Sequence, residues 1–332
     1  MTVTLKEVSQ QAGVSRSAVS RTFTDGASVS AKTRKKVEDA AVALGYTPSL
    51  IASSLKTKRT KLIGLVANNF QNPVFLQVFD LFTRALQARG FRPLLVNLTD
   101  ETDPAHSVSM LKQYSVDGVI IATSTLPPTF AKAFRQAHVP VVHAFGRFDK
   151  DVNVDVVGID NVACGKMAAK TLLARGYRTI AILGGPEAAT STQDRVKGFQ
   201  QAMNKAGMVI ADISFARNYT HAAGLEAMTA LLQRGSVEAV FCGDDLICIG
   251  AIDAARADGL SIPGQIGFLG FNDMEMAGWQ AYDLTTIRQP IVDIIQHAVE
   301  IIVTIDGTDR VPTTRLFPCE VVERGSLRPV PH

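Results

Sequence analysis

The most informative stretch of the chain is residues 3–61, VTLKEVSQQAGVSRSAVSRTFTDGASVSAKTRKKVEDAAVALGYTPSLIASSLKTKRTK. Its apolar residues recur at the three- and four-residue spacing of short amphipathic helices. Ser15 and Ser30 stand where a hydroxyl can cap the second and third helix, and Gly45 stands where the third helix would end. The residues predicted to face inward are Leu5, Val8, Ala12, Ala18, Val19, Phe23, Val37, Ala40, Ala41 and Leu44. The pattern predicts a small all-α domain of three helices.

The second of these helices leaves Arg16, Ser17, Ser20 and Arg21 on its outer face. In a helix-turn-helix the second helix enters the major groove, where base edges present the donors and acceptors that Arg, Ser and Thr side chains can contact. A small helical domain whose charged face is merely solvated would have the same pattern. The helices alone leave both interpretations open.

The charge distribution favours the DNA-binding interpretation. Residues 1–60 contain ten Lys and Arg against four Asp and Glu, a balance of +6, whereas the whole chain, with 34 against 31, carries only +3. Basic charge is therefore concentrated in the part that would contact phosphates. The rest of the chain need not contact nucleic acid.

Residues 48–56, PSLIASSLK, can form one short helix, which the cationic linker TKRTK follows. A helix of about two turns is unstable by itself in water because nucleation is costly. We expect it to form only when docked on DNA beside a second copy. Leu55 would then be an exposed wedge in the minor groove. A frayed linker with one incidental leucine is the alternative, and the sequence does not choose between them.

Four blocks, in order, resemble the lactose/galactose repressor (LacI/GalR-type) family of bacterial transcription regulators: VTLKEVSQQAGVSRSAVSR, VSAKTRKKVEDAAVALGYTPS, ASSLKTKRTKLIGLV and GFNDMEMAGWQAYDLTTIRQP. The similarity runs along nearly the whole chain. It implies a homodimer that binds double-stranded operator DNA under the control of a small effector. Carried over by position, it assigns groove and phosphate contacts to Thr4, Ser15, Arg16, Ser17 and Arg21, backbone contacts to Ser30 and Thr33, and the minor-groove hinge element to Leu55 and Lys56.

Length and composition fit this picture. The chain has 332 residues, 46% of them hydrophobic, which allows two further lobes of ordinary size after the basic domain. The sequence shows neither an apolar run long enough to cross a membrane nor an export signal, so we expect a cytoplasmic protein. The four cysteines are scattered and suggest reduced core thiols, with no metal site and no cofactor. No leucine heptad follows Val321, which favours a dimer over a tetramer.

From Leu62 onward apolar strand-like runs alternate with helical stretches, and the alternation starts again after residues 158–161. This rhythm is typical of parallel sheets covered on both faces. It predicts two doubly wound α/β lobes, and the resemblance implies a periplasmic-binding-protein-like core in which the helix at 290–305 returns to the first lobe. The predicted strands are 62–66, 92–96, 118–121, 139–143, 179–183, 239–242 and 267–269, and the predicted helices 75–88, 105–114, 129–137, 164–174, 194–205 and 246–257.

We expect a helix-turn-helix domain over 1–47, a hinge helix and linker over 48–61, and an effector-binding and dimerisation domain over 62–332. Within the last, lobe one would comprise residues 62–159 and 291–318, and lobe two residues 160–290 and 319–332.

Polar residues lie where predicted strands end, which is where ligands bind in such lobes. Asp244 and Asp245 follow one strand, Asn272 and Asp273 another, and Arg195 begins a helix after a loop. Each has a structural alternative: Asp245 could cap its helix, Asn272 could fill a turn and Arg195 could pair with a carboxylate. Their convergence at equivalent strand ends favours a ligand site.

The family resemblance adds to this set. Arg195 matches an arginine that relatives use on ligand hydroxyls or carboxylates. Asp244 stands where Asn is common and Asn272 where Asp is common, so no relative's sugar can be transferred to this chain. Further candidates are Phe70, Phe75 and Tyr219 as apolar walls, or as ordinary core aromatics, and Arg147 and Gln289 near the cleft. If Arg147 and Arg195 both point inward, the ligand would be acidic, such as a sugar acid.

The sequence therefore predicts a sequence-specific transcriptional repressor whose operator affinity a sugar, polyol or sugar acid controls. The alternatives are a sugar-binding receptor, or a sugar-processing α/β enzyme, with an unrelated basic N-terminal extension. Gly184-Gly185-Pro186 resembles a phosphate loop only loosely, since proline lacks an amide donor, and the six histidines have no metal-ligand spacing. The predicted protein is thus not an enzyme.

Overall fold

The computed structural model describes residues 3–24, 26–48, 54, 59–68, 70–98, 104–305 and 310–331. It comprises two compact units, Met1–Lys61 with Ser115–Asp117, and Leu62–Tyr114 with Gly118–His332. Asp117 joins the first unit because its carboxylate accepts hydrogen bonds from the backbone amides of Thr60 (2.8 Å) and Lys61 (3.0 Å). No helix in the described part of the chain is both long and apolar enough to cross a membrane.

The first unit contains a three-helix headpiece of α1 (Leu5–Ala12), α2 (Arg16–Thr22) and α3 (Ala31–Leu44). The hydroxyls of Ser15 and Ser30 accept hydrogen bonds from the amides of Ala18 and Thr33, at 3.2 Å in both cases, which confirms the two predicted caps. Six of the residues predicted to face inward form the buried apolar centre of the headpiece: Val8, Ala12, Val19, Val37, Ala40 and Ala41. Leu5, Phe23 and Leu44 pack against this centre, whereas Ala18 is only half-buried and lies outside it.

The first lobe of the second unit is a six-stranded sheet in the order β11-β5-β4-β3-β1-β2, parallel throughout. Helices α5 and α12 pack together, as do α6 and α7. The strands are β1 (Leu62–Ala67), β2 (Arg92–Asn97), β3 (Gly118–Ala122), β4 (Val141–Ala144), β5 (Asp155–Ile159) and β11 (Thr314–Phe317). The helices are α5 (Val74–Gln87), α6 (Pro104–Gln113), α7 (Pro128–Gln136) and α12 (Ile291–Thr304).

The second lobe repeats this layout in the order β12-β10-β9-β8-β6-β7, with helix pairs α8–α9 and α10–α11. Its strands are parallel except β12, which pairs antiparallel with β10. The strands are β6 (Ile180–Gly184), β7 (Asp212–Phe215), β8 (Ala239–Cys242), β9 (Gly267–Asn272), β10 (Thr286–Arg288) and β12 (Glu320–Val322). The helices are α8 (Asn161–Ala174), α9 (Thr190–Lys205), α10 (His221–Arg234), α11 (Asp245–Ala257) and the short 3-10 helix η1 (Glu275–Gly278).

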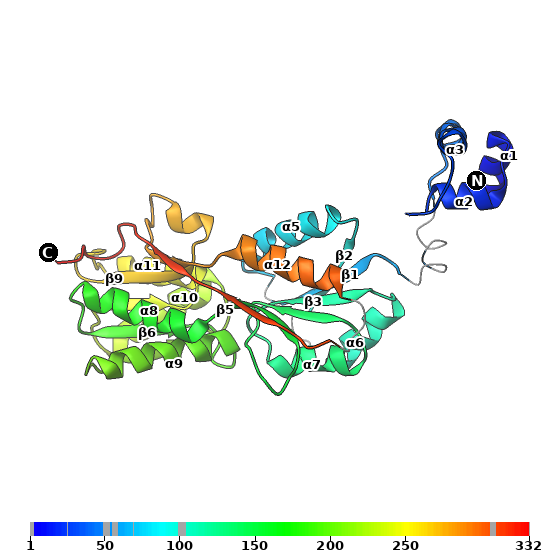
Figure 1. Ribbon diagram of the computed structural model, residues 1–332. Helices are drawn as coiled ribbons and strands as arrows, with labels where there is room; N and C mark the ends of the chain where they lie inside the picture. The colour runs from blue at the N-terminus through cyan, green and yellow to red at the C-terminus, as the bar shows by residue number, and fades with distance from the viewer. Residues whose placement is uncertain are drawn as a thin grey trace. The chain divides into compact units, whose positions relative to one another are not determined.

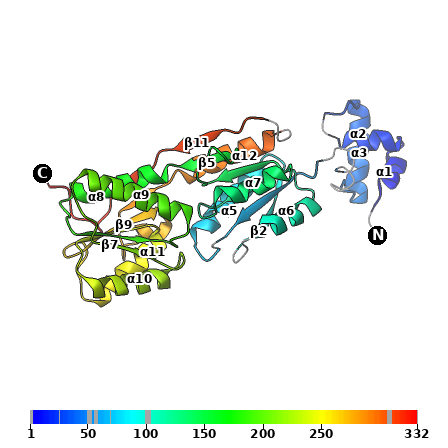
Figure 2. The same ribbon diagram turned by 90° about the horizontal axis from the view of Figure 1, so that it is seen from below.

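The chain passes between the two lobes three times: between β5 and α8, between β10 and α12, and between β11 and β12. Helix α12 packs on α5 and on strands β3, β4 and β5, which confirms that this helix returns to the first lobe. Figures 1 and 2 show its orange ribbon against the first-lobe sheet, with the red final segment running on from β11 into the second lobe. The predicted pair of doubly wound α/β lobes is confirmed.

Some predicted boundaries are wrong in a way that affects the site. Helix α9 begins at Thr190, so Arg195 lies in its second turn and not at its start. Strand β9 extends to Asn272, which is the last residue of the strand and not part of the turn after it. The side chain that caps α11 belongs to Asp244, not Asp245. Strands β5, β7, β10, β11 and β12 and helix α10 were not predicted.

Glycine allows each helix pair of the second lobe to pack at very short range. A Cβ atom on Gly165 of α8 would lie 2.0 Å from the carbonyl oxygen of Arg195, and one on Gly198 of α9 would lie 1.9 Å from that of Val162. Helices α10 and α11 repeat the arrangement at Gly224 and Gly250. Since no side chain fits there, these glycines fix the position of α9 and of Arg195 on it.

Candidate functional site

The outer face of α2 carries residues that the sequence predicts to face the major groove. Arg16, Ser17 and Arg21 are exposed. The Arg21 Nε donates weakly to the Ser17 carbonyl oxygen, at 3.4 Å, while Arg16 makes no hydrogen bond or ion pair within the described residues. Both guanidinium groups can therefore approach a partner without first losing a strong contact.

The other predicted DNA contacts lie at helix starts. The Thr4 amide and hydroxyl donate to Glu7 Oε2 at 2.7 and 2.8 Å, and the amide hydrogen bond, with the hydroxyl second, lowers the pKa of Glu7. The hydroxyls of Ser15 and Ser17 lie 2.9 Å apart. Those of Ser30 and Thr33 are also 2.9 Å apart. Leu55 and Lys56, the predicted minor-groove element, lie outside the described residues.

The polar centre of the second unit is the carboxylate of Asp244, at the end of β8 and the start of α11. Its Oδ1 accepts the amides of Leu246 (2.8 Å) and Ile247 (3.4 Å), which caps the helix. Its Oδ2 accepts two side-chain amides, at 2.8 Å each: Asn272 from β9, and Asn72 from the first lobe. Burial raises the pKa of Asp244, and these hydrogen bonds oppose that rise. The two lobes thus meet at one buried carboxylate.

Asn272 extends this centre toward the crossover after β10. Its Oδ1 accepts the Gln289 side-chain amide at 2.5 Å, so Gln289, Asn272, Asp244 and Asn72 form one hydrogen-bonded chain. Asn272 and Asp273 have φ angles of +116° and +56°, a conformation that L residues rarely adopt. Backbone strain of this kind persists where the surroundings hold it, and it is frequent at ligand sites.

Arg195 approaches the same centre from α9. Its guanidinium carbon lies 3.5 Å from the centroid of the Phe271 ring, while Nε donates to Asn161 Oδ1 (2.8 Å) and Nη1 to the Gly243 carbonyl (2.6 Å). The side chain is buried, and burial lowers the pKa of Arg195. Since Gly243 directly precedes Asp244, this hydrogen bond fixes the guanidinium next to the carboxylate.

The three candidate aromatic walls lie in different places. Tyr219 covers Gly185, where a Cβ would lie 2.5 Å from its ring, and its hydroxyl is 3.4 Å from that of Thr192. The glycines at 184–185 therefore make room for an aromatic ring and do not form a phosphate loop. Phe70 and Phe75 flank Asn72 in sequence, and both rings contact Phe79, with centroids 4.9 and 6.0 Å apart.

Arg147 lies at a second contact between the lobes. Its Nε bonds Asp194 Oδ2 and its Nη2 bonds the Thr190 carbonyl, both at 2.7 Å and both on α9. Beside it, the Thr190 hydroxyl donates to the Ser124 carbonyl at 2.7 Å. The positive charge of Arg147 is thus paired with a carboxylate.

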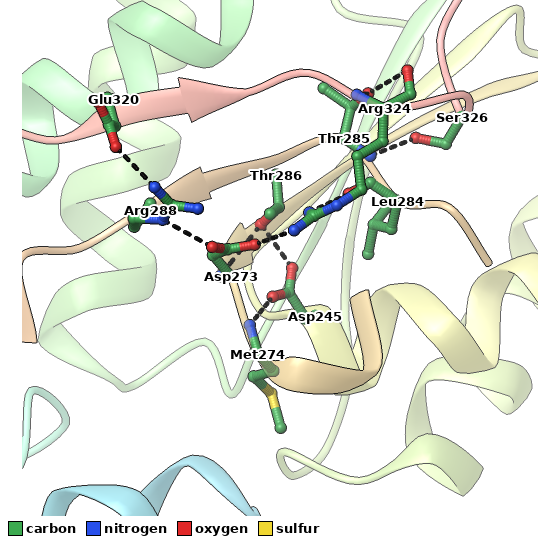
Figure 3. Close-up of polar contacts among 10 residues, drawn as sticks. All are labelled: Asp245, Asp273, Met274, Leu284, Thr285, Thr286, Arg288, Glu320, Arg324 and Ser326. Carbon is green, nitrogen blue, oxygen red and sulfur yellow. Dashed lines mark hydrogen bonds and ion pairs between the residues drawn. The ribbon is translucent and has the colours of Figure 1, made fainter. Parts of the chain in front are cut away.

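Figure 3 shows a further polar network around Asp273, the residue that follows Asn272 in the chain. Asp273 bonds Arg288 and Arg324 at 2.7 Å each, and Arg288 also bonds Glu320 across β10 and β12 at 2.9 Å. Asp245 accepts the Thr286 hydroxyl (2.7 Å) and the Met274 amide (2.8 Å). These contacts hold the strained turn after β9 against the C-terminal strand.

A groove of about 620 Å³ borders this turn. Pro73, Val74 and Gln77 line it from the start of α5, and Met274 and Trp279 line it from the segment after β9. Its lining also includes Asp273, so that Pro73 and Asp273, the residues that directly follow Asn72 and Asn272 in the chain, both border the groove.

Comparison with known proteins shows the family. Residues 60–304 match the family described as periplasmic binding proteins and sugar binding domain of LacI family, and residues 4–49 match bacterial regulatory proteins, lacI family. The chain belongs to the LacI family. It is 34% identical to the HTH-type transcriptional regulator DegA of Bacillus subtilis over 89% of this chain and 88% of that protein. It is 31% identical to the HTH-type transcriptional repressor PurR of Proteus mirabilis, over 98% and 96%.

Solved structures share the fold. The lac repressor dimer bound to operator and the anti-inducer ONPF superposes with a TM-score of 0.87 over 98% of this chain and 99% of that one, at 24% identity. A LacI family regulator from Silicibacter pomeroyi gives 0.79 over 98% and 100%, at 27% identity. As a LacI-family member the chain is a DNA-binding transcription regulator with a ligand-binding core. These relatives are regulators of transcription and not enzymes. This confirms the prediction from the sequence that the protein is a transcription regulator and not an enzyme.

In this LacI-family chain, sequence reasoning missed Asn72 and Asn161. Asn72 precedes a proline after the first strand of the first lobe, a position equivalent to those that drew attention to Asp244 and Asn272. The strand-end rule could therefore have found it. Asn161 also follows a strand end, that of β5, but β5 was not predicted, and its partner Arg195 lies 34 residues away.

Proposed function

We propose that this LacI-family protein is a homodimeric repressor that binds double-stranded operator DNA, and that a sugar, polyol or sugar acid bound between its lobes controls operator affinity. The observation that carries the proposal is the buried carboxylate of Asp244, which accepts Asn72 from one lobe and Asn272 from the other. A ligand that competes for these groups changes how the lobes are held together.

The DNA contacts are proposed on the headpiece. The exposed α2 side chains would read the major groove, and the helix starts would grip the sugar-phosphate backbone. The residues assigned are Thr4, Ser15, Arg16, Ser17, Arg21, Ser30 and Thr33, with Leu55 and Lys56 as the hinge element in the minor groove.

The ligand contacts are proposed at the polar centre. Asp244 would accept ligand hydroxyls, Asn72, Asn272 and Gln289 would both donate and accept, and Arg195 would donate. Tyr219, Phe70 and Phe75 are the proposed apolar walls. Arg147 is a weaker candidate because Asp194 neutralises it, so a neutral sugar or polyol fits this site better than a sugar acid.

The partners and the domain boundaries follow from the same proposal. A DNA-bound repressor acts in the cytoplasm, and the lac repressor relative bound to operator is a dimer. We place the DNA-binding domain at 1–47, the hinge at 48–61 and the ligand-binding domain at 62–332. The division of the structure at Lys61 and Leu62 supports the last boundary.

A gel-shift titration tests DNA binding. The purified full chain should retard DNA from upstream of its own and neighbouring genes, and each doubling of salt should weaken this binding steeply, since Lys and Arg displace counterions from phosphates. Unrelated DNA of equal length should bind at least about a thousandfold more weakly. Equal retardation of both DNAs, or of neither, would contradict the assignment.

A thermal-shift screen of sugars, polyols, sugar acids and nucleobases tests the ligand site. A hit should raise the Tm of the wild type and of Arg217→Ala, which alters an exposed ion pair in the same lobe. It should not raise the Tm of Arg195→Ala or Asp244→Asn, whereas both variants should still bind operator. An undiminished Tm shift in both variants would place the ligand elsewhere.

A further inference from the structure

Two cysteines from distant parts of the chain meet where the lobes join. Cys164 lies in the first turn of α8, and Cys319 lies in the crossover between β11 and β12. Strand β11 pairs with β5 so that Phe317 lies opposite Ile159, which brings the two following segments side by side. Cys164 belongs to the buried core of this unit and Cys319 packs against the same core, where each thiol shifts the pKa of the other. Cys164 is 3% exposed, whereas Cys319 is partly open to solvent.

The surroundings of this pair favour a thiolate. The interaction with Cys319 lowers the pKa of Cys164 most, and the positive charge of Arg195 lowers it further, although burial and Asp160 oppose this. The same interaction, together with burial, raises the pKa of Cys319. The glycine contact between α8 and α9 independently brings the two helices together here, because Gly165, next to Cys164, lies against the backbone of Arg195. A thiolate is the form of cysteine that attacks peroxides and disulfides.

The chain also contains a second thiol pair, which has carboxylates and not a guanidinium group as its charged neighbours. Cys242 and Cys248 are both fully buried and lie close enough together for Cys242 to affect the pKa of Cys248. Their neighbours include Asp244 and Asp245 in place of a guanidinium, and burial is the largest of the causes that raise the pKa of Cys248. This pair should resist oxidation and serves as an internal control.

We propose that Cys164 and Cys319 form a redox-modification site at which hydrogen peroxide converts two thiols into a disulfide. The Cys164 thiolate attacks one peroxide oxygen, the O–O bond breaks, and a sulfenic acid and one water result after protonation. The Cys319 sulfur then attacks the Cys164 sulfur, the S–S bond forms, and the sulfenic oxygen leaves as a second water. Two thiols lose two electrons in total, and one peroxide gains them.

The disulfide would have a direct structural consequence. It would tie the third crossover to the first turn of α8 and consume the Cys164 thiol, whose pKa the charge of Arg195 helps to lower. The oxidation state of this pair and the arrangement of the lobes are then linked.

The test is peptide mapping of the full-length, fully reduced protein after treatment with hydrogen peroxide. We expect the intact mass to fall by two hydrogens and a Cys164–Cys319 cross-link to form on the order of tenfold faster than any oxidation of Cys242 or Cys248. Differential alkylation of the wild type gives this result without relying on a variant that must fold.

Single variants then separate the two steps. Cys319→Ser should abolish the cross-link and leave a Cys164 sulfenic acid that dimedone traps, whereas Cys164→Ser should leave Cys319 reduced at the same dose. Cys242→Ser should keep the cross-link. Faster oxidation of the Cys242–Cys248 pair, a disulfide between two copies, or loss of both thiols to sulfinic acid without a cross-link would each overturn the proposal.

Discussion

Asp245 shows, at the scale of one residue, how burial controls a titration. Its carboxyl group is fully buried and receives two hydrogen bonds, from Thr286 and Met274 (Figure 3). Burial is the largest cause that raises its pKa, and the neighbouring carboxylates of Asp244 and Asp273 add to it, so the pKa reaches about 7. The group therefore takes up a proton when the chain folds in mildly acidic buffer.

This shift predicts the pH dependence of stability. Because the folded pKa exceeds the unfolded value of about 3.9, the stability from Asp245 is complete below about pH 4 and is lost as the pH rises through about 7. Asp245→Asn cannot ionise and escapes this loss. Between about pH 4 and about pH 7, the free energy of unfolding of Asp245→Asn should rise relative to that of the wild type by up to about 1.4 kcal/mol per pH unit. Urea unfolding at several pH values measures this difference.

The exposed Asp258, at the end of the same helix, provides the matched control. Asp258→Asn should follow the wild type within about 0.5 kcal/mol at every pH. Parallel curves for wild type and Asp245→Asn would show that the Asp245 carboxyl has an ordinary pKa in the folded protein.

The strand-end argument located much of the candidate site from sequence. Asp244 and Asn272 prove to be hydrogen-bonded to each other because carboxyl ends of parallel strands meet at one edge. Gln289, which the family resemblance added, bonds Asn272. The partner of Arg147 was out of reach, because Asp194 lies 47 residues away on the other lobe. The tertiary structure, and not the local sequence, determines which carboxylate pairs with a given arginine.

At the scale of secondary-structure elements, paired glycines hold the helices of the second lobe together. A methyl group on Gly198 would lie 1.9 Å from a backbone carbonyl oxygen of α8, and backbone cannot rotate away as a side chain can. The gain from removing a flexible glycine is at most about 1 kcal/mol. Overpacking therefore decides the outcome of a substitution here.

Gly198→Ala should destabilise the protein by about 1–3 kcal/mol in urea unfolding, as other overpacked cores do. It should also weaken ligand binding, because Arg195 must move with α9. Gly235→Ala is the control, since Gly235 has an extended backbone and nothing near its Cβ position, and it should be neutral. Equal stability of the two variants would show that α8 and α9 separate without cost.

Arg16 of α2 yields a prediction about base recognition. Arg16→Ala should weaken operator binding by about 1–3 kcal/mol, roughly 5- to 150-fold, and relax the choice of base at one position. Lys58→Ala, in the cationic linker, should weaken binding to all sequences alike and reduce the salt slope by about one. Gel shifts on the operator and on single-base variants distinguish the two patterns, and identical patterns would remove Arg16 from the readout.

Most elements with strong periodicity were predictable, and several of the missed ones are short or polar, although the buried strand β5 and helix α10 were also missed. Strand β7 is a sheet edge with only one buried residue, and β11 is largely exposed, so neither forms an apolar run. Strand β12 has three residues and depends on its antiparallel partner β10. Because pairing with distant strands defines these elements, local sequence contains little signal for them.

At the scale of the ligand-binding unit, direct contacts join the lobes. Asn72 reaches Asp244 at one place, and Arg147 reaches Asp194 at another. Because the Arg147 and Asp194 side chains are only 31% and 19% exposed, water screens their attraction less than it screens a surface pair. This ion pair should therefore stabilise the arrangement of the lobes measurably.

A double-mutant cycle tests this pair. The coupling between Arg147→Ala and Asp194→Ala in the free energy of unfolding should be about 0.5–3 kcal/mol. The same cycle on Arg84 and Asp80, an ion pair within α5 that is 76% and 56% exposed, gives the reference. It should yield only about 0.3–0.5 kcal/mol. Equal coupling in both cycles would mean that the contact between the lobes adds nothing beyond a surface pair.

The three crossovers have a consequence for how the protein is made. Neither lobe is a continuous segment, because β11 completes the first sheet and β12 the second. On the ribosome the headpiece can fold as soon as it emerges, whereas both lobes must wait for residues beyond 313. A nascent chain arrested before that point would expose the edge of β5, and with it a surface open to aggregation. Domain exchange between relatives should therefore succeed for the headpiece and fail for either lobe alone.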